Sequence, residues 1–111
     1  MDLTKEIAAY SDRVIDTLKK VSTKEIDTVL QLFIQARDAG KQIFIMGNGG
    51  SAATASHFVC DFNKGVSYGK SKRFKFICLN DNQATLMAYA NDVSYDDIFV
   101  EQLKNFFNPG D

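Results

Sequence analysis

The chain has few residues of the kinds that hold structural metals or cross-link secreted proteins, with one histidine and two cysteines among its 111 residues. Cys60 and Cys78 stand in apolar surroundings and have neither CxxC nor zinc-finger spacing. Free cysteine is among the most buried residue types. We therefore predict two free, reduced thiols in the core.

An excess of either charge is also absent. Thirteen Lys and Arg against fourteen Asp and Glu leave a net charge of -1, which gives no electrostatic footprint for nucleic acid or for an anionic membrane. No uninterrupted apolar segment has the length of a signal peptide or of a membrane span. With 45% apolar residues, the composition favours one soluble, cytoplasmic domain over residues 1–111.

What the sequence does contain is two helical patterns followed by a strand–helix–strand pattern. Apolar residues at steps of three and four predict an amphipathic helix over 3–21, whose apolar stripe needs a partner. A capping box at Ser22–Glu25 opens a second helix, which Gly40 ends. Short β-branched and aromatic runs predict parallel strands at 42–46 and 74–79. Further helices are expected at 51–63, 83–89 and 96–107, with a polar turn at 91–95 and with Ile98, Phe99, Leu103 and Phe106 facing inward.

This order predicts an α/β fold, with a helical pair at 1–40 and a βαβ core at 41–111. Two parallel strands are a poor core, because each keeps one exposed edge. The residues 108–111 form a turn signal of the kind that separates a helix from a following strand. We therefore expect the chain to be the N-terminal portion of a longer α/β domain.

The most informative segment joins the first strand to the third helix. An apolar run ends at Met46 and is followed by Gly47-Asn48-Gly49-Gly50-Ser51-Ala52. Glycine backbone can approach an anion closely, and the first amides of a helix lack partners within that helix. The helix dipole adds positive potential, and Ser51 can donate one further hydrogen bond. The segment predicts a phosphate site.

Two other interpretations of the same residues remain open. The segment matches G-x-G-x-x-A, the relaxed dinucleotide-binding pattern. However, two long helices precede it, and the nearest acid for a ribose, Asp81, lies about thirty residues on rather than about 20. The segment can also be a tight turn that binds nothing. The Walker A pattern is absent, because no GK[ST] follows.

His57 and Asp61 are four residues apart, so their side chains project from one face of the third helix. An imidazole and a carboxylate at this spacing can ligate zinc or act as an acid–base pair. A simple hydrogen bond on the helix surface is the alternative. Catalytic zinc usually takes three protein ligands, so further ligands would have to come from elsewhere.

Two polar groups complete the set of candidates. Asn91 and Asp92 follow the second strand and a helical stretch, where the carboxyl ends of parallel strands form a ligand crevice, although the pair alone is typical of a turn. A basic cluster is expected to be a solvated loop. It comprises Lys64, Lys70, Lys72, Arg73 and Lys75.

Together, the segment 47–51, His57-Phe58, Asn91-Asp92 and Asp96-Asp97-Ile98-Phe99 resemble the sugar isomerase (SIS) domain family. The most similar branch is the sedoheptulose 7-phosphate isomerases, also called phosphoheptose isomerases. The resemblance runs over essentially the whole chain.

This resemblance implies a three-layer αβα fold around a parallel sheet and an active site built between the subunits of a homotetramer. It implies that Asn48, Gly49, Gly50 and Ser51 contact a phosphorylated sugar, and that Asn91 and Asp92 hold its hydroxyls. His57 would be a zinc ligand. Asp61 stands where those isomerases carry a glutamate that serves as metal ligand and acid–base group, and its side chain is one methylene shorter.

The resemblance also implies an enzyme that interconverts sedoheptulose 7-phosphate and an aldose heptose 7-phosphate. The family's second phosphate loop and its C-terminal helix with further site residues would lie beyond Asp111, so we expect no turnover by this chain alone. A non-catalytic sugar-phosphate sensor or a protein-binding scaffold is the alternative function. A dinucleotide-binding module is the third.

Overall fold

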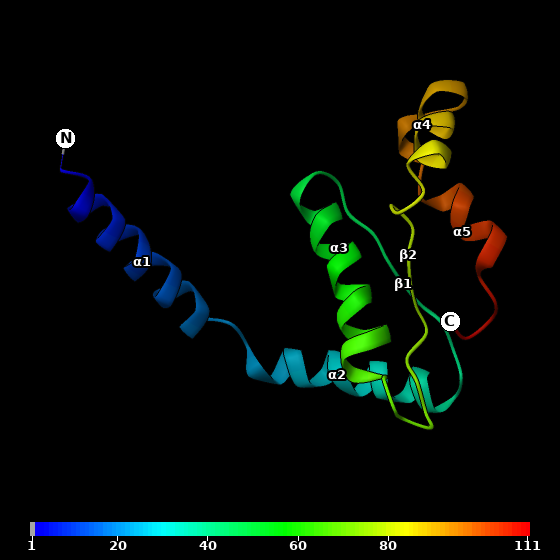
Figure 1. Cartoon of the computed structure of the whole chain (residues 1–111), viewed down its shortest axis with the longest axis horizontal. Coiled ribbons are helices and arrows are strands. Elements are labelled where there is room, and N and C mark those ends of the chain that lie inside the picture. The colour runs from blue at the N-terminus through cyan, green and yellow to red at the C-terminus, as the bar shows by residue number, and fades with distance from the viewer. Residues whose placement is uncertain (1) are drawn as a thin grey trace. The chain divides into compact units, whose positions relative to one another are not determined.

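The structure is a computed structural model that describes residues 2–111 and falls into two compact units, with the boundary between Gln31 and Leu32. Figure 1 gives the order of the helices and strands along the chain. No helix within residues 2–111 is both long enough and apolar enough to cross a membrane.

The first unit is helical, as the sequence predicts. Helix α1 covers Leu3–Lys19, and the Asp2 carboxylate caps it by accepting the Thr4 N–H at 3.1 Å. Helix α2 covers Thr23–Asp38 and begins in this unit. The Ser22 hydroxyl accepts the Glu25 N–H at 3.2 Å, which is the contact expected of a capping serine.

The second unit contains the parallel sheet. Strands β1 (Ile43–Ile45) and β2 (Phe76–Cys78) pair in parallel with Ile43 opposite Phe76, and both are shorter than the sequence predicts. Helix α3 (Gly50–Cys60) connects them and packs against β2. Thus the predicted βαβ order is confirmed within residues 32–111.

Phenylalanine rings fill the space between α3, β2 and the end of α2. The Phe33 ring meets Phe58, Phe62 and Phe76 edge-on, with centroid distances of 5.2–6.2 Å. Phe62 lies 4.5 Å from Phe76, and both Phe74 and Phe76 are buried. Aromatic pairs at these separations contribute about 0.5–1.5 kcal/mol beyond their buried area. This cluster fixes α3 on the sheet.

Several predicted boundaries are corrected. The helix expected over 51–63 is α-helical to Cys60 and continues as a π-helical segment, η1 (Asp61–Val66). Helix α4 covers Gln83–Asp92, so Asn91 and Asp92 lie in its last turn and not in the polar turn that we predicted. The final helix is divided into a 3-10 turn, η2 (Tyr95–Asp97), and α5 (Val100–Phe106).

Three predicted burials are also corrected. Cys60 is exposed and Cys78 only half-buried. The reason at Cys60 is helix geometry: Phe58 and Phe62 face inward, and a residue two positions from each points to the opposite side. Phe106 is half-exposed, whereas Gln102 is buried and donates to the carbonyls of Leu79 and Ile98.

Candidate functional site

The loop from Gly47 to Ala52, called here the glycine loop, turns the chain from the end of β1 into α3. Two glycines are required by its shape. Gly49, at the N-cap of α3, has a φ of +55°, a region that L side chains rarely adopt. At Gly47, an added Cβ would lie 2.5 Å from the backbone carbonyl of Ser51. The loop therefore closes tightly on itself.

Hydrogen bonds within the loop use several of its polar groups. The Asn48 N–H donates to the Ser51 hydroxyl at 2.9 Å, and that hydroxyl donates back to the Asn48 carbonyl at 2.7 Å. The hydroxyl proton that we expected Ser51 to offer to a ligand is thus donated inside the loop. The N–H groups of Ser51 and Ala52 donate to Asn48 and Gly49 carbonyls.

Two backbone amides of the loop have no hydrogen-bond partner among the described residues. Within residues 2–111, the N–H groups of Gly49 and Gly50 have no hydrogen-bond acceptor. They stand at the start of α3, where the helix dipole is positive. Adjacent free amides at a helix N-terminus suit an anion, and phosphate is the common biological example.

Asn80, two residues beyond the end of β2, contacts the loop, and sequence reasoning missed it. Its carboxamide oxygen accepts the Gly47 N–H at 3.0 Å, and its nitrogen donates to the Ala52 carbonyl and the Ser56 hydroxyl, both at 3.1 Å. In the sequence, the run Asn80-Asp81-Asn82 indicated a turn and a helix cap. No local signal distinguishes a buried asparagine from a turn asparagine there.

His57 and Asp61 meet on the outer face of α3, as their spacing predicts. Nδ1 of His57 lies 3.5 Å from Oδ1 of Asp61, and the side chains are 74% and 67% exposed. They line a shallow hollow of about 390 Å³ with Ala53, Thr54 and Phe58. The hollow therefore lies beside the first turns of α3, the helix that follows the glycine loop.

The donor geometry of this pair fits one edge of a zinc site. A tetrahedral zinc ion with bonds of about 2.1 Å holds neighbouring donors about 3.4 Å apart. The 3.5 Å separation matches that spacing. However, no third His, Cys, Asp or Glu joins them anywhere in residues 2–111. The pair can supply two ligands and requires the rest of the coordination shell from elsewhere.

Asn91 and Asp92 lie apart from these groups. Asn91 donates to the Asp92 carboxylate at 2.7 Å, and Asp92 lines a separate hollow of about 230 Å³ beside Tyr89 and Val93. Among the described residues, no hydrogen bond links this pair to the glycine loop or to His57, and the hollow beside Asp92 does not include either of them. Asp81 likewise serves locally, accepting a short hydrogen bond from the Ser56 hydroxyl.

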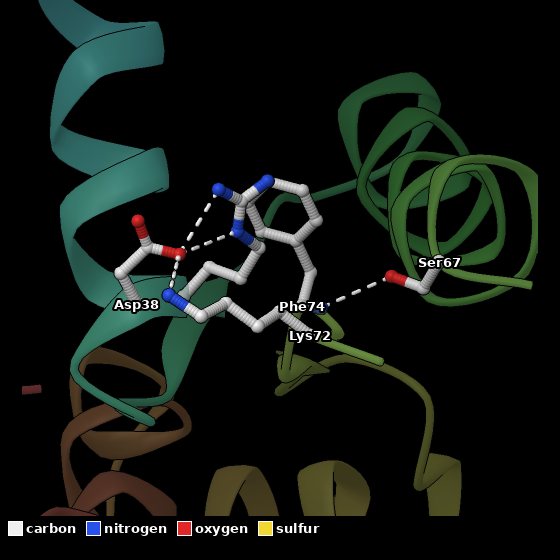
Figure 2. Close-up of polar contacts among 5 residues, drawn as sticks. Asp38, Ser67, Lys72 and Phe74 are labelled. Carbon is white, nitrogen blue, oxygen red and sulfur yellow. Dashed lines mark hydrogen bonds and ion pairs between the residues drawn. The ribbon is translucent and has the colours of Figure 1, made fainter. Parts of the chain in front are cut away.

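The basic cluster is exposed at all five of its positions, which confirms the prediction of a solvated loop, and two of its lysines also make contacts. Lys72 pairs with Asp38 at 3.4 Å, as Figure 2 shows, and Lys75 donates to the Gly40 carbonyl at 3.0 Å. The adjacent Arg37 donates to Asp38 and, with Lys72, lowers the pKa of that carboxyl. These contacts hold the loop before β2 against the end of α2, so the cluster has a structural use.

With this geometry in place, comparison with known proteins defines the class. The family model of the SIS domain matches residues 8–111, and the chain belongs to that family. The structure resembles that of phosphoheptose isomerase GmhA from Neisseria gonorrhoeae, with a TM-score of 0.83, 27% identity, and coverage of 98% of this chain and 57% of the other.

The sequence relatives narrow the comparison further. The chain is 32% identical to a probable phosphoheptose isomerase from Thermoplasma volcanium, over 96% of this chain and 54% of the relative. It is 36% identical to a phosphoheptose isomerase from Thermodesulfovibrio yellowstonii, over 93% and 52% respectively. The chain therefore spans about half the length of these curated relatives.

Proposed function

We propose that the chain supplies the phosphate-binding part of a sugar-phosphate isomerase that interconverts a ketose and an aldose, with sedoheptulose 7-phosphate as substrate. The observation that carries the proposal is the pair of free amides at Gly49 and Gly50, at the start of α3. Membership of the SIS domain family and the relatives' name, phosphoheptose isomerase, support the choice of sugar phosphate.

In this proposal the phosphate sits on the glycine loop. The amides of Gly49 and Gly50 donate to its oxygens, and the dipole of α3 stabilises its charge. Ser51 can redirect its hydroxyl proton from the Asn48 carbonyl to the ligand, because a hydroxyl rotates freely. Asn48 contributes its side-chain amide, and Asn91 with Asp92 holds sugar hydroxyls.

Asp61 is the proposed acid–base group. Its exposed carboxylate takes the proton from the carbon next to the substrate carbonyl and returns it to the carbonyl carbon, through an enediolate. The proton of the adjacent hydroxyl moves to the former carbonyl oxygen, so that a ketose becomes an aldose. His57 and Asp61 are the residues that would hold zinc, whose charge stabilises an oxyanion when it is bound. His57 also orients the Asp61 carboxylate through their contact.

A non-catalytic sensor or scaffold is the second candidate function. It is compatible with Asp61, which stands where the isomerases that the chain resembles carry a glutamate and whose side chain is one methylene shorter. In that case the glycine loop binds a sugar phosphate without turnover. Isomerase activity of a protein that spans the full length of the relatives separates the two functions, whereas phosphate binding by this chain does not.

The test combines binding with turnover. We expect sedoheptulose 7-phosphate to raise the melting temperature of the 111-residue chain, with and without zinc, and no isomerisation by the chain alone. The Asp61→Asn variant should bind sedoheptulose 7-phosphate as the wild type does. So should the control Asp12→Asn, which removes an exposed carboxylate of α1. Absence of any shift with sedoheptulose 7-phosphate or inorganic phosphate at millimolar concentration would refute the proposal.

A further inference from the structure

Asn80 is a nearly buried polar side chain with no assigned role. It is 9% exposed and makes three hydrogen bonds, to the Gly47 N–H, the Ala52 carbonyl and the Ser56 hydroxyl. Its carboxamide carries no charge and has no acid–base chemistry near neutral pH. Its use must therefore lie in what it holds in place.

The two backbone partners of Asn80 are the first and the last residues of the glycine loop. One carboxamide, two residues beyond the end of β2, thus ties together both ends of the loop. The bonds between Asn48 and Ser51 close the middle of the loop. Gly49 and Gly50, whose amides have no acceptor within residues 2–111, lie between these two sets of contacts.

The partners also fix which way the carboxamide faces. The Gly47 N–H can only donate and the Ala52 carbonyl can only accept, so oxygen and nitrogen cannot exchange places without losing both bonds. Ser56 donates its own proton to the Asp81 carboxylate, which leaves its lone pairs for the Asn80 nitrogen. Asn80 therefore has one satisfied orientation.

A glycine-rich loop has wide conformational freedom, and binding an anion requires that its amides point the same way beforehand. Without Asn80, the Gly47 N–H would lose its acceptor, and the loop would be tied to β2 only through the chain itself. Preorganised donors bind an oxyanion more strongly than donors that must first be ordered.

We propose that Asn80 is a positioning residue that preorganises the glycine loop for phosphate. This inference rests on the proposed phosphate binding by the loop and adds a residue outside it, 33 positions along the chain from Gly47. Asn80 does not touch the ligand. It acts through the orientation of the Gly49 and Gly50 amides.

Asn63 offers a matched control. Its carboxamide also bridges the backbone, accepting the Phe76 N–H at 3.0 Å and donating to the Phe76 carbonyl at 2.9 Å, but it contacts β2 and not the glycine loop. Both Asn→Ala changes remove hydrogen bonds to backbone groups without adding charge. A role limited to general stability predicts similar behaviour for the two variants.

The experiment titrates the 111-residue chain with inorganic phosphate while NMR follows the amide signals of Gly49 and Gly50. We expect Asn80→Ala to weaken phosphate binding at least about tenfold and to shift both amide signals before phosphate is added. Asn63→Ala should keep the dissociation constant within about twofold, even where its melting temperature falls. Asn80→Ser keeps a hydroxyl that can bond one of the partners, so its phosphate affinity should lie between those of the wild type and Asn80→Ala. It replaces Asn80→Ala in the experiment if Asn80→Ala does not fold.

The outcomes separate the two proposals. A wild-type chain that binds no phosphate refutes the proposed function and removes the basis of this inference. A wild-type chain that binds phosphate, with Asn80 variants that bind equally well, refutes the positioning role alone. Equal weakening by Asn80→Ala and Asn63→Ala also refutes it, because the effect would then follow stability.

Discussion

Gly47 is the residue at which the loop tolerates a side chain least. A Cβ there would lie 2.5 Å from the Ser51 carbonyl carbon and oxygen, which are backbone atoms that cannot rotate away. We predict that Gly47→Ala destabilises the fold by about 1–3 kcal/mol, as overpacking does, and abolishes phosphate binding by opening the loop. Chemical denaturation and a phosphate titration measure the two effects.

Gly65 is the control for this substitution. Nothing lies within 4 Å of a Cβ at Gly65, and its φ is not positive. Gly65→Ala should therefore be neutral or stabilise the chain by about 0.4–1 kcal/mol, through reduced freedom of the unfolded state. Equal losses of stability in Gly47→Ala and Gly65→Ala would show that position 47 does not need glycine for the tight closure of the loop.

Asp111 gives a pH dependence whose sign is fixed by its hydrogen bonds. The backbone N–H groups of Gln42 and Asn108 donate to its carboxylate and hold its pKa below the usual 3.8. Its contribution to stability is therefore complete above about pH 4 and is lost as the pH falls through the lowered pKa. We predict that Asp111→Asn lowers the free energy of unfolding at pH 6 and that this loss shrinks on acidification.

Urea denaturation from about pH 2.5 to pH 6 provides the measurement. Asp12→Asn is the control, because it removes an exposed carboxylate from the first unit. A difference between wild type and Asp111→Asn that grows toward low pH would contradict the assigned hydrogen bonds.

Single residues also show where sequence reasoning reaches its limit. The contact between His57 and Asp61 was predictable, because residues four apart on a helix always share a face. The contact of Asn80 with Gly47 was not, because it joins residues 33 apart and depends on the register in which β1 and β2 pair. Gln102 was missed for the same reason, since its acceptor Leu79 lies 23 residues away.

At the scale of elements, helix α4 depends on its cap. The Asn82 side chain accepts the Thr85 N–H at 3.0 Å, as the asparagine before the helical pattern predicted. We predict that Asn82→Ala destabilises the second unit by about 1 kcal/mol and lowers the helical signal in circular dichroism. Asn105→Ala, an exposed change inside α5, should stay within about 0.5 kcal/mol of wild type. A larger loss at Asn105 than at Asn82 would contradict the cap.

The ends of elements were predicted where a local signal exists and missed where it does not. Three helix boundaries were predicted from such signals. Ser22 and Asn82 cap the helices that follow them, and Gly40 has a positive φ just beyond the end of α2. By contrast, Asn91 and Asp92 are typical turn residues that here extend α4 by a turn, and the chain leaves the helix only at Val93. Tertiary packing overrides such weak preferences.

At the scale of the whole chain, the α/β class followed from the alternation of patterns, and the family followed from its motifs. The arrangement of the site did not follow. Within residues 2–111, no hydrogen bond joins Asn91 or Asp92 to the glycine loop, although the resemblance assigns all of them to one substrate. The resemblance to the SIS domain family implies that subunits meet at this site, and we propose such a homo-oligomer for this chain.

The outer surface of α1 offers a direct test of self-association. Leu3, Ile7, Tyr10 and Leu18 lie on one stripe and are 59–66% exposed, and no residue of α1 is buried. Burying one such side chain against a second copy of the chain contributes about 1.5–3 kcal/mol to the free energy of association. We predict that the chain associates with itself in sedimentation experiments, and that the double change Ile7→Lys and Leu18→Lys weakens this association more than tenfold.

The control adds the same charge to the other face of α1. Ala9→Lys with Asp16→Asn makes the same change of net charge away from the stripe, because on a helical projection Ala9 lies about 180° and Asp16 about 160° from Leu18. This variant should keep the oligomeric state of the wild type, and circular dichroism should show unchanged helix content in both. If both doubles dissociate equally, net charge and not the apolar stripe governs assembly. If neither dissociates, the chains meet through another surface.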